Sequence, residues 1–537
     1  MGAVLPEQND VVELAAEEGH DADIPTNIGV YNSSGKHSPH ALPSALGKDV
    51  DLEKSEASVR TSIDDQEGCA QPLQDPNIVD WDSPGDPENP MNWPKAKKWG
   101  AICIVSSITF LIPLGSSMFA PGVPDLMAEF HSDSELLSGF VVSVYVLGFA
   151  VGPLIIAPLS EMYGRLPLYH TCNILFIVFN VACALSTSLS MLIAFRFLAG
   201  CVGASPLTLG GGTIADVIPR EQRGTAMAIW VAGPCIGPVV GPLSGGFLSK
   251  AAGWRWNFWV VSIAAGVVTA AGLIFMSETY AIVILNRKVR RLRKETGNMA
   301  LRSKLDTSSL PPRDLFFFSI IRPTKMLFKS PIVFLLSLYV AVAYAYLYIL
   351  FTTFTLVYNQ QYGFDSGIAG LTYLGIGIGS VIGQWVYTVW GNRSVRSALA
   401  KGNFTPEKRL PLMFPGAISM PIGLFWYGWA VEKHTHWIVP IIGTAFVGFG
   451  LMLIFMAPST YLVDVYTLHA ASAMAANTVM RSIFGAFIPL AGQPMYRALG
   501  LGWGNSLLGF FAIALIPIPI LFVKYGEELR RKFPVKL

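Results

Sequence analysis

Two arginines stand inside long apolar stretches of the chain, where a charge is costly. Arg196 lies in the run Leu-Ile-Ala-Phe-Arg-Phe-Leu-Ala-Gly, and the stretch around Arg481 is apolar on both sides. An arginine at the centre of a membrane helix costs at least about 2.5–3.5 kcal/mol, so it normally faces protein or water and has a task there. We expect this of both side chains, and the alternative for Arg196 is that it snorkels to an interface.

Acidic and basic residues also meet at two short polar turns. Glu161 and Arg165 occupy the turn Ser-Glu-Met-Tyr-Gly-Arg, where they can pair with neighbouring helix ends, and Asp216 precedes a turn that continues to Arg220 and Arg223. The glycine and prolines around Glu161 favour a tight turn between closely packed helices. The alternative for the turn at Glu161 and Arg165 is an ordinary charged connection.

A Gly-Pro pair recurs every four residues further along the chain. The array consists of Gly233, Pro234, Gly237, Pro238, Gly241 and Pro242. Prolines remove backbone hydrogen bonds and glycines permit close packing, so the pattern predicts a bent helix that serves as a conformational pivot. Such clusters are also common in membrane helices with a purely structural role.

A further group of residues has the chemistry of a cavity for an amphipathic organic molecule, with aromatic walls and few polar groups. Its candidate members are Tyr344, Tyr348, Gln384, Asn477 and Arg481. The alternative for each tyrosine is an anchor at the lipid interface.

These residues are carried by apolar runs of about 18–25 residues, each long enough to cross a bilayer as a helix. Of the 537 residues, 52% are hydrophobic and 14% are charged, which disfavours a soluble protein. The predicted spans are 100–122, 137–158, 167–187, 190–216, 225–248, 257–277, 331–356, 367–390, 411–431, 437–459, 471–493 and 503–524. The fold class is therefore an all-α membrane protein with 12 transmembrane helices, and the near absence of polar stripes and of regular turn signals disfavours soluble helices and sheets.

Polar segments divide these spans into domains. We predict a disordered cytosolic N-terminal tail (1–98), a six-helix bundle (99–277), a basic cytosolic loop (278–329), a second six-helix bundle (330–524) and a cytosolic C-terminal tail (525–537). Arginine and lysine gather in alternate loops, so the positive-inside rule places both termini in the cytosol. The net charge of +2 gives no indication of a nucleic-acid partner.

The turn and the proline array resemble the motifs of the major facilitator superfamily. Ala157, Glu161, Gly164 and Arg165 occupy the places of its loop signature, with the first glycine and the aspartate replaced, and the turn is similar to that of fungal twelve-span drug:proton antiporters of the multidrug or polyamine type. The resemblance implies two six-helix bundles, a role in proton coupling or gating for Arg196, Glu161, Arg165 and Asp216, and an antiporter motif at Gly233–Pro242.

The function expected from the residues and the resemblance is secondary active transport, with proton-coupled efflux of a drug, toxin or secondary metabolite by alternating access. The alternatives are a polyamine exporter and a non-transporting membrane sensor or scaffold on the same fold. An enzyme is not expected, because no nucleotide-binding or hydrolase motif stands where chemistry can use it. We expect no cofactor and no metal. The expected partners are a small organic substrate, protons and the lipid bilayer, and the protein is expected to be a monomer in the plasma membrane.

Overall fold

The computed structural model describes residues 77–219, 223–305, 312–403, 405–466 and 470–533. These described residues make one compact unit. Its long elements are helices, and the strands among the described residues are two short ones, β1 (Ile78–Val79) and β2 (Arg302–Ser303), which pair in parallel. The first-half helices are α1 (Lys95–Ser117), α2 (Val123–Glu129), α3 (Glu135–Tyr163), α4 (Arg165–Ala184), α5 (Leu189–Gly203), α6 (Ser205–Val217), α7 (Arg223–Ala252) and α8 (Arg255–Phe275).

Two helices, α9 (Ala281–Thr296) and α10 (Pro312–Lys329), follow in the basic loop. The second-half helices are α11 (Pro331–Tyr362), α12 (Ser366–Leu371), α13 (Leu374–Ala400), α14 (Met413–Glu432), α15 (Ile438–Val465), α16 (Ala470–Phe487), α17 (Gly492–Leu515) and α18 (Pro517–Lys532). Short 3-10 turns lie at Pro90–Asn92 (η2), Ala120–Gly122 (η3), Pro406–Leu412 (η5) and Ile488–Ala491 (η7).

Eleven ranges among the described residues are long and apolar enough to cross a membrane. The last range, Ser472–Lys532, contains two crossings, because Gly500 interrupts α17 with a left-handed φ of 77° and a ψ of 170°. Glu432 accepts hydrogen bonds from the backbone N–H groups of Leu501 (2.9 Å) and Gly502 (3.2 Å), so it caps the helical segment that starts after this break. Division at Gly500 gives the twelve crossings predicted from the sequence.

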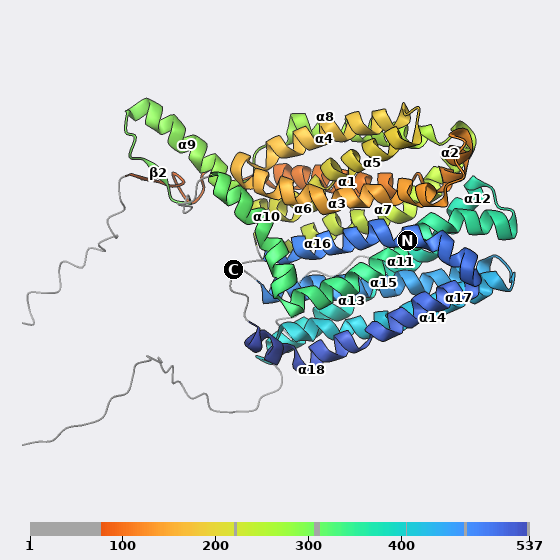
Figure 1. Cartoon of the computed structure of the whole chain (residues 1–537). Coiled ribbons are helices and arrows are strands. Elements are labelled where there is room, and N and C mark those ends of the chain that lie inside the picture. Colours follow the sequence, from red (N-terminus) through yellow and green to blue (C-terminus); the bar gives the residue numbers. More distant parts are fainter. Residues whose placement is uncertain (1–76, 220–222, 306–311, 404, 467–469, 534–537) are drawn as a thin grey trace, which may run out of the picture. The chain divides into compact units, whose positions relative to one another are not determined.

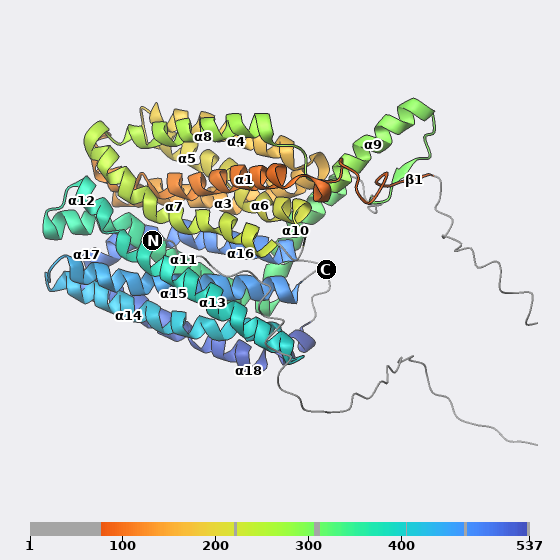
Figure 2. The same cartoon turned by 180° about the vertical axis from the view of Figure 1, so that it is seen from behind.

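The twelve crossings form the two six-helix bundles of the expected fold, with the first-half helices on one side and the second-half helices on the other (Figure 1). Large apolar side chains remain exposed on the outward faces, for example Val267 (67%) and Ile274 (73%) in α8, as suits helices surrounded by lipid. Because crossings alternate in direction, α1 begins and α18 ends at the same end of the bundle, where α9 and α10 also lie (Figure 1 and Figure 2). We call this the basic end, and the other the distal end.

The last part of the predicted disordered tail has regular structure. Residues 1–76 lie outside the described residues, but β1 and η2 precede α1, which begins at Lys95 inside the predicted tail. Lys288 of α9 binds the carboxylates of Asp82 (2.6 Å) and Asp86 (3.7 Å), and it is itself buried. The prediction that disorder extends to residue 98 is therefore wrong at this end, because the segment is held by ion pairs and strand pairing with the basic loop.

Candidate functional site

Arg196 of α5 is completely enclosed in the first bundle, with 1% of its surface exposed. Its Nε donates to the carbonyl oxygen of Val141 (2.6 Å), and Nη2 donates to the carbonyls of Ser116 (3.1 Å) and Val142 (3.5 Å). The guanidinium lies 5.0–5.7 Å from the centres of three aromatic rings, those of Phe119, Tyr145 and Phe258.

The bonding pattern of Arg196 therefore ties α5 to α1 and α3 through backbone oxygens. The close approach of α3 and α5 depends on glycine, because a Cβ atom on Gly200 would come within 2.1 Å of the Tyr145 carbonyl oxygen. The Arg196 guanidinium is thus enclosed by protein and does not extend to the surface as a snorkelling side chain would.

A cluster of charges lies at the basic end of the first bundle. Arg165 donates through Nε to Asp216 (3.5 Å) and through Nη1 to the Ser160 hydroxyl (2.7 Å), and its guanidinium stacks over Tyr280 at 4.7 Å. Glu161 is exposed one helical turn earlier and interacts electrostatically with Arg165 and with Arg322 of α10. Three of the predicted gating residues, Glu161, Arg165 and Asp216, are therefore brought together here, and Arg196 belongs to a separate site.

Glu278 is a member of this cluster that the sequence analysis missed. The side chain is 7% exposed, and its two oxygens accept from the backbone N–H groups of Arg165 (3.0 Å), Leu166 (3.2 Å), Thr279 (3.0 Å) and Tyr280 (3.0 Å). The carboxylate thereby caps the N-terminus of α4, where a negative charge is favoured. The available signal was a single acidic residue directly after the sixth apolar run.

The same contact explains the glycine of the turn. Gly164 has a φ of 101°, and a Cβ atom at this position would lie 2.2 Å from Oε2 of Glu278. A side chain at residue 164 would therefore be strained by the backbone and would also displace the carboxylate.

The glycine and proline array forms one continuous helix, α7, with Pro234, Pro238 and Pro242 inside it. Its glycines face the backbone of α1: a Cβ atom would lie 2.9 Å from the Phe110 nitrogen at Gly233, 3.0 Å from the Leu114 nitrogen at Gly237, and 2.9 Å from the Leu114 oxygen at Gly241. Pro242 is also close to the second bundle, because a Cβ atom on Gly370 of α12 would lie 2.5 Å from the Pro242 carbonyl oxygen. The helix therefore packs between α1 and the second bundle, and its role as a pivot remains a proposal.

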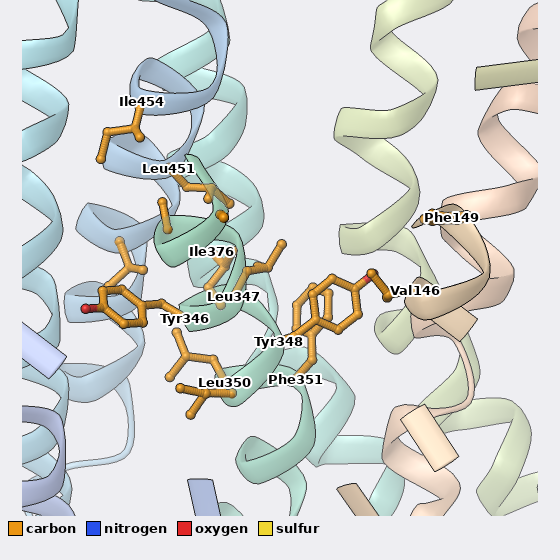
Figure 3. Packing of buried hydrophobic residues seen from close by; sticks show 14 of the residues in the cluster. Val146, Phe149, Tyr346, Leu347, Tyr348, Leu350, Phe351, Ile376, Leu451 and Ile454 are labelled. Atoms are coloured by element: carbon orange, nitrogen blue, oxygen red, sulfur yellow. The ribbon is translucent and has the colours of Figure 1, made fainter. Parts of the chain in front are cut away.

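Two of the predicted cavity tyrosines line the boundary between the bundles. Tyr348 of α11 points toward Val146 and Phe149 of α3, whereas Tyr346 points the other way (Figure 3) and donates to the Leu508 carbonyl oxygen at 3.0 Å. The Tyr348 hydroxyl lies 3.1 Å from Oγ of Ser116 in α1, so it connects the two bundles. Its ring centre lies 5.1 Å from that of Tyr344.

Arg481 of α16 adjoins these tyrosines. Its guanidinium lies 5.1 Å from the ring centre of Tyr344 and 4.9 Å from that of Phe455 in α15. Asn477 precedes it by one helical turn and is 1% exposed. The Gln384 amide donates to Thr388 on its own helix α13 at 3.5 Å, whereas the group around Arg481 comes from α11, α15 and α16.

At the distal end, charged pairs join the two bundles directly. Lys250 of α7 binds Asp365, the N-cap residue of α12, at 2.6 Å, and Arg497 of α17 pairs with Glu135 of α3. We call the Lys250–Asp365 pair the distal latch. The hydrogen bond from Lys250 holds the pKa of the Asp365 carboxyl below its usual value.

Metal ligands do not gather in the part of the chain that the structure describes: no group of three His, Cys, Asp or Glu side chains there could hold an ion. The absence of a cofactor and of a metal therefore stays a prediction.

Two apolar six-helix bundles with polar side chains along their boundary define a helical membrane transport protein. The sequence profile of the Major Facilitator Superfamily matches residues 105–489, and the chain belongs to this family. It is 58% identical to the "MFS-type transporter penM" of Penicillium rubens over 86% of this chain and 91% of the relative. It is 55% identical to the "Efflux pump radE" of Floropilus chiversii over 86% of this chain and 87% of the relative. Among solved structures, a D-xylose–proton symporter matches with a TM-score of 0.61 at 16% identity, over 79% of this chain and 97% of that one, and so shares the fold.

Proposed function

We propose that this transporter exports a small organic compound in exchange for protons by alternating access of its two bundles. The observation that carries the proposal is the group of aromatic and polar side chains at the boundary between the bundles, where Tyr348 reaches Ser116 of the other bundle and adjoins Tyr344 and Arg481. A substrate held here contacts both bundles, so its binding depends on how they are placed. The similarity to a fungal efflux pump supports export as the direction.

Proton coupling requires a group that titrates. Arginine keeps its proton, so Asp216 and Glu161 are the members of the predicted coupling set that can exchange one. In this proposal the ion pair between Arg165 and Asp216 weakens when Asp216 takes up a proton. Arg196 holds α1, α3 and α5 together during the movement.

We also propose a direction of insertion, which is based on the positive-inside rule. The basic end, with α9, α10 and α18, lies in the cytosol, and the distal latch lies outside the cell. We further propose that the protein works as a monomer in the plasma membrane, with bundle boundaries at residues 99–277 and 330–524.

The polyamine alternative has less support from the site. A substrate carrying several positive charges would meet the guanidinium of Arg481 at the bundle boundary, and like charges repel strongly in a medium of low dielectric constant.

Flux measurements test the proposal. Cells with and without the protein are profiled against a panel of organic compounds, and a compound to which it confers resistance is added to proteoliposomes that contain the purified protein. Vesicles with an acidic interior should accumulate the compound, and a protonophore should abolish the accumulation. Resistance without gradient-driven accumulation would contradict proton exchange, and absence of both would favour the sensor or scaffold alternative.

A further inference from the structure

The guanidinium of Arg481 has no acidic partner among the described residues, although it stands inside the apolar range Ser472–Lys532. It stands eleven residues after Ala470, the first residue of α16, which is roughly 16 Å along the helix. Its neighbours are the rings of Tyr344 and Phe455, and Nε has no hydrogen-bond partner in the described structure. Arg196 differs, because three backbone carbonyl oxygens accept from its Nε and Nη2.

Asn477 is a second unsatisfied group on the same side of α16. Residues four apart share one face of a helix, so Asn477 and Arg481 lie one above the other. Asn477 has 1% of its surface exposed, and its Oδ1 has no partner in the described structure. Buried polar groups are nearly always hydrogen-bonded, so a ligand or water that accepts from Arg481 Nε, and a hydroxyl or water that donates to Asn477 Oδ1, would complete them.

The cluster is accessible even though it lies mid-helix. Tyr344, Phe455 and Arg481 come from α11, α15 and α16, and each is partly exposed. The position of Tyr344 is restricted by Gly485 of α16, where a Cβ atom would lie 2.9 Å from the ring and 3.4 Å from Val146 of the first bundle. Three partly exposed side chains on three helices therefore meet next to the bundle boundary.

We infer that Arg481 forms the acid-binding subsite of the transporter, with Asn477 beside it as an acceptor for a hydroxyl group or a water, and that the substrates are aromatic organic acids bound as anions. The planar guanidinium fork can donate two parallel hydrogen bonds to a carboxylate. The carboxylate also supplies the negative charge that Arg481 lacks among the described residues. The rings of Tyr344, Tyr348 and Phe455 provide flat apolar surface for the aromatic body of the substrate. This inference rests on the proposed function, because it assigns the substrate class of the same site.

A pair of probes that differ in charge but hardly in shape tests the inference. Binding of tritiated 2-naphthoate and of 2-naphthamide to the purified, detergent-solubilised full chain is measured by equilibrium dialysis. The wild type should bind the carboxylate at least about tenfold more tightly than the amide, the ratio expected for a charge-assisted hydrogen bond. Arg481→Gln should abolish this preference, and Arg481→Lys should retain part of it.

Arg255→Gln is the matched control. Arg255 also stacks on an aromatic ring, that of Trp254 at 4.3 Å, but Glu129 already supplies its carboxylate at 2.5 Å. The control should keep the wild-type preference, and thermal unfolding of each variant checks that it is folded. Equal binding of the two probes, no binding of 2-naphthoate by the wild type, or a preference that survives in Arg481→Gln would overturn the inference.

The proteoliposome assay separates this result from the proposed function. If gradient-driven accumulation of a resistance compound occurs while the wild type binds both probes equally, export stands and the acid-binding subsite is wrong. If the charge preference holds and disappears in Arg481→Gln while no compound is accumulated, the subsite stands and export is wrong.

Discussion

Gly245 of α7 lies against the carbonyl oxygen of Met118 at the end of α1, so closely that a Cβ atom on the glycine would approach this oxygen to 1.8 Å. The neighbouring glycines at positions 233, 237 and 241 repeat the contact along α1 at intervals of one helical turn. A regular row of glycines therefore brings the backbones of the two helices together, as small residues do in other membrane proteins.

Gly245→Ala should separate α7 from α1, because the added methyl group meets backbone atoms that cannot rotate away. We expect a loss of stability of at least about 1–3 kcal/mol, measured as a lower unfolding temperature of the detergent-solubilised protein. Gly266→Ala in α8 is the control, because nothing lies within 4 Å of its added Cβ and alanine is the better helix former. Equal effects of the two substitutions would show that the glycine row does not set the helix distance.

The sequence analysis predicted that the glycines and prolines at 233–242 form a bent pivot. Only the packing face of this helix could be predicted from the local sequence. Four-residue spacing of glycine indicates a packing face regardless of the rest of the chain. The partner of that face, α1, was not predictable, because Met118 and Gly245 are far apart in sequence and nothing in either segment specifies the other.

Arg196→Ala should destabilise the first bundle as well as change transport. The substitution leaves a cavity among Phe119, Tyr145 and Phe258 and removes the donors to Val141 and Ser116, so we expect a loss of about 2–5 kcal/mol. The unfolding temperature and proton-driven efflux per folded molecule are measured together. Arg255→Ala, at a partly exposed ion pair, should change the stability by less than about 1 kcal/mol.

Efflux per folded molecule decides what Arg196 does beyond stability. A supporting role in the movement of α1, α3 and α5 predicts that efflux falls at every pH. A loss confined to one pH range would instead mean that Arg196 acts on a titrating group.

Glu278→Ala should lower the free energy of unfolding more than Glu278→Gln. Glutamine keeps one acceptor oxygen but places an amide N–H₂ opposite a backbone N–H, whereas alanine leaves all four N–H donors around residues 165 and 279 without this partner. We expect losses of about 1 kcal/mol for glutamine and about 3 kcal/mol for alanine, because bonds to a charged acceptor are the stronger ones. Thermal unfolding measures both, and Glu295→Ala on the exposed face of α9 should have no effect.

Features that depend on neighbouring residues could be predicted from the sequence, and contacts between residues far apart in the sequence could not. The twelve crossings were readable because a bilayer requires about twenty apolar residues wherever a helix crosses it. The surroundings of Arg196 were not, because its acceptors come from residues 55 and 80 positions away and are backbone atoms, which carry no sequence signal. The pairing of β1 with β2 was equally hidden, since each strand has two residues.

The distal latch should be independent of pH over the physiological range. Hydrogen bonding to Lys250 lowers the pKa of Asp365 below 3.8, so the pair is fully charged above that value and is lost only as the pH falls through the lowered pKa. The rate at which a thiol reagent labels a cysteine introduced at the distal end should therefore show no pH dependence between pH 5 and pH 8 that is due to the Lys250–Asp365 pair. Lys250→Gln should raise the accessibility at every pH in this range, and the exchange Lys250→Asp with Asp365→Lys should restore it.

Glu161 links the charge cluster to the connection between the bundles, because it interacts with Arg165 of its own bundle and with Arg322 of α10. Burial lowers the pKa of Arg322, and the charge of Glu161 opposes this shift. Glu161→Gln removes an interaction that depends on the position of α10, but it leaves the Arg481 cluster intact. We therefore expect probe binding to stay within about twofold of the wild type, while turnover changes by about two- to fivefold, as expected for a partly exposed charge pair.

The test compares dissociation constants with transport rates in the same preparation. Glu161→Arg combined with Arg322→Glu should recover part of the lost turnover, because opposite charges again face each other between α3 and α10. Arg291→Gln controls for the general loss of charge at the basic end, since Arg291 pairs with Glu88 instead. A parallel loss of binding and turnover in Glu161→Gln would place Glu161 in the substrate pathway and contradict a role in the contact between α3 and α10.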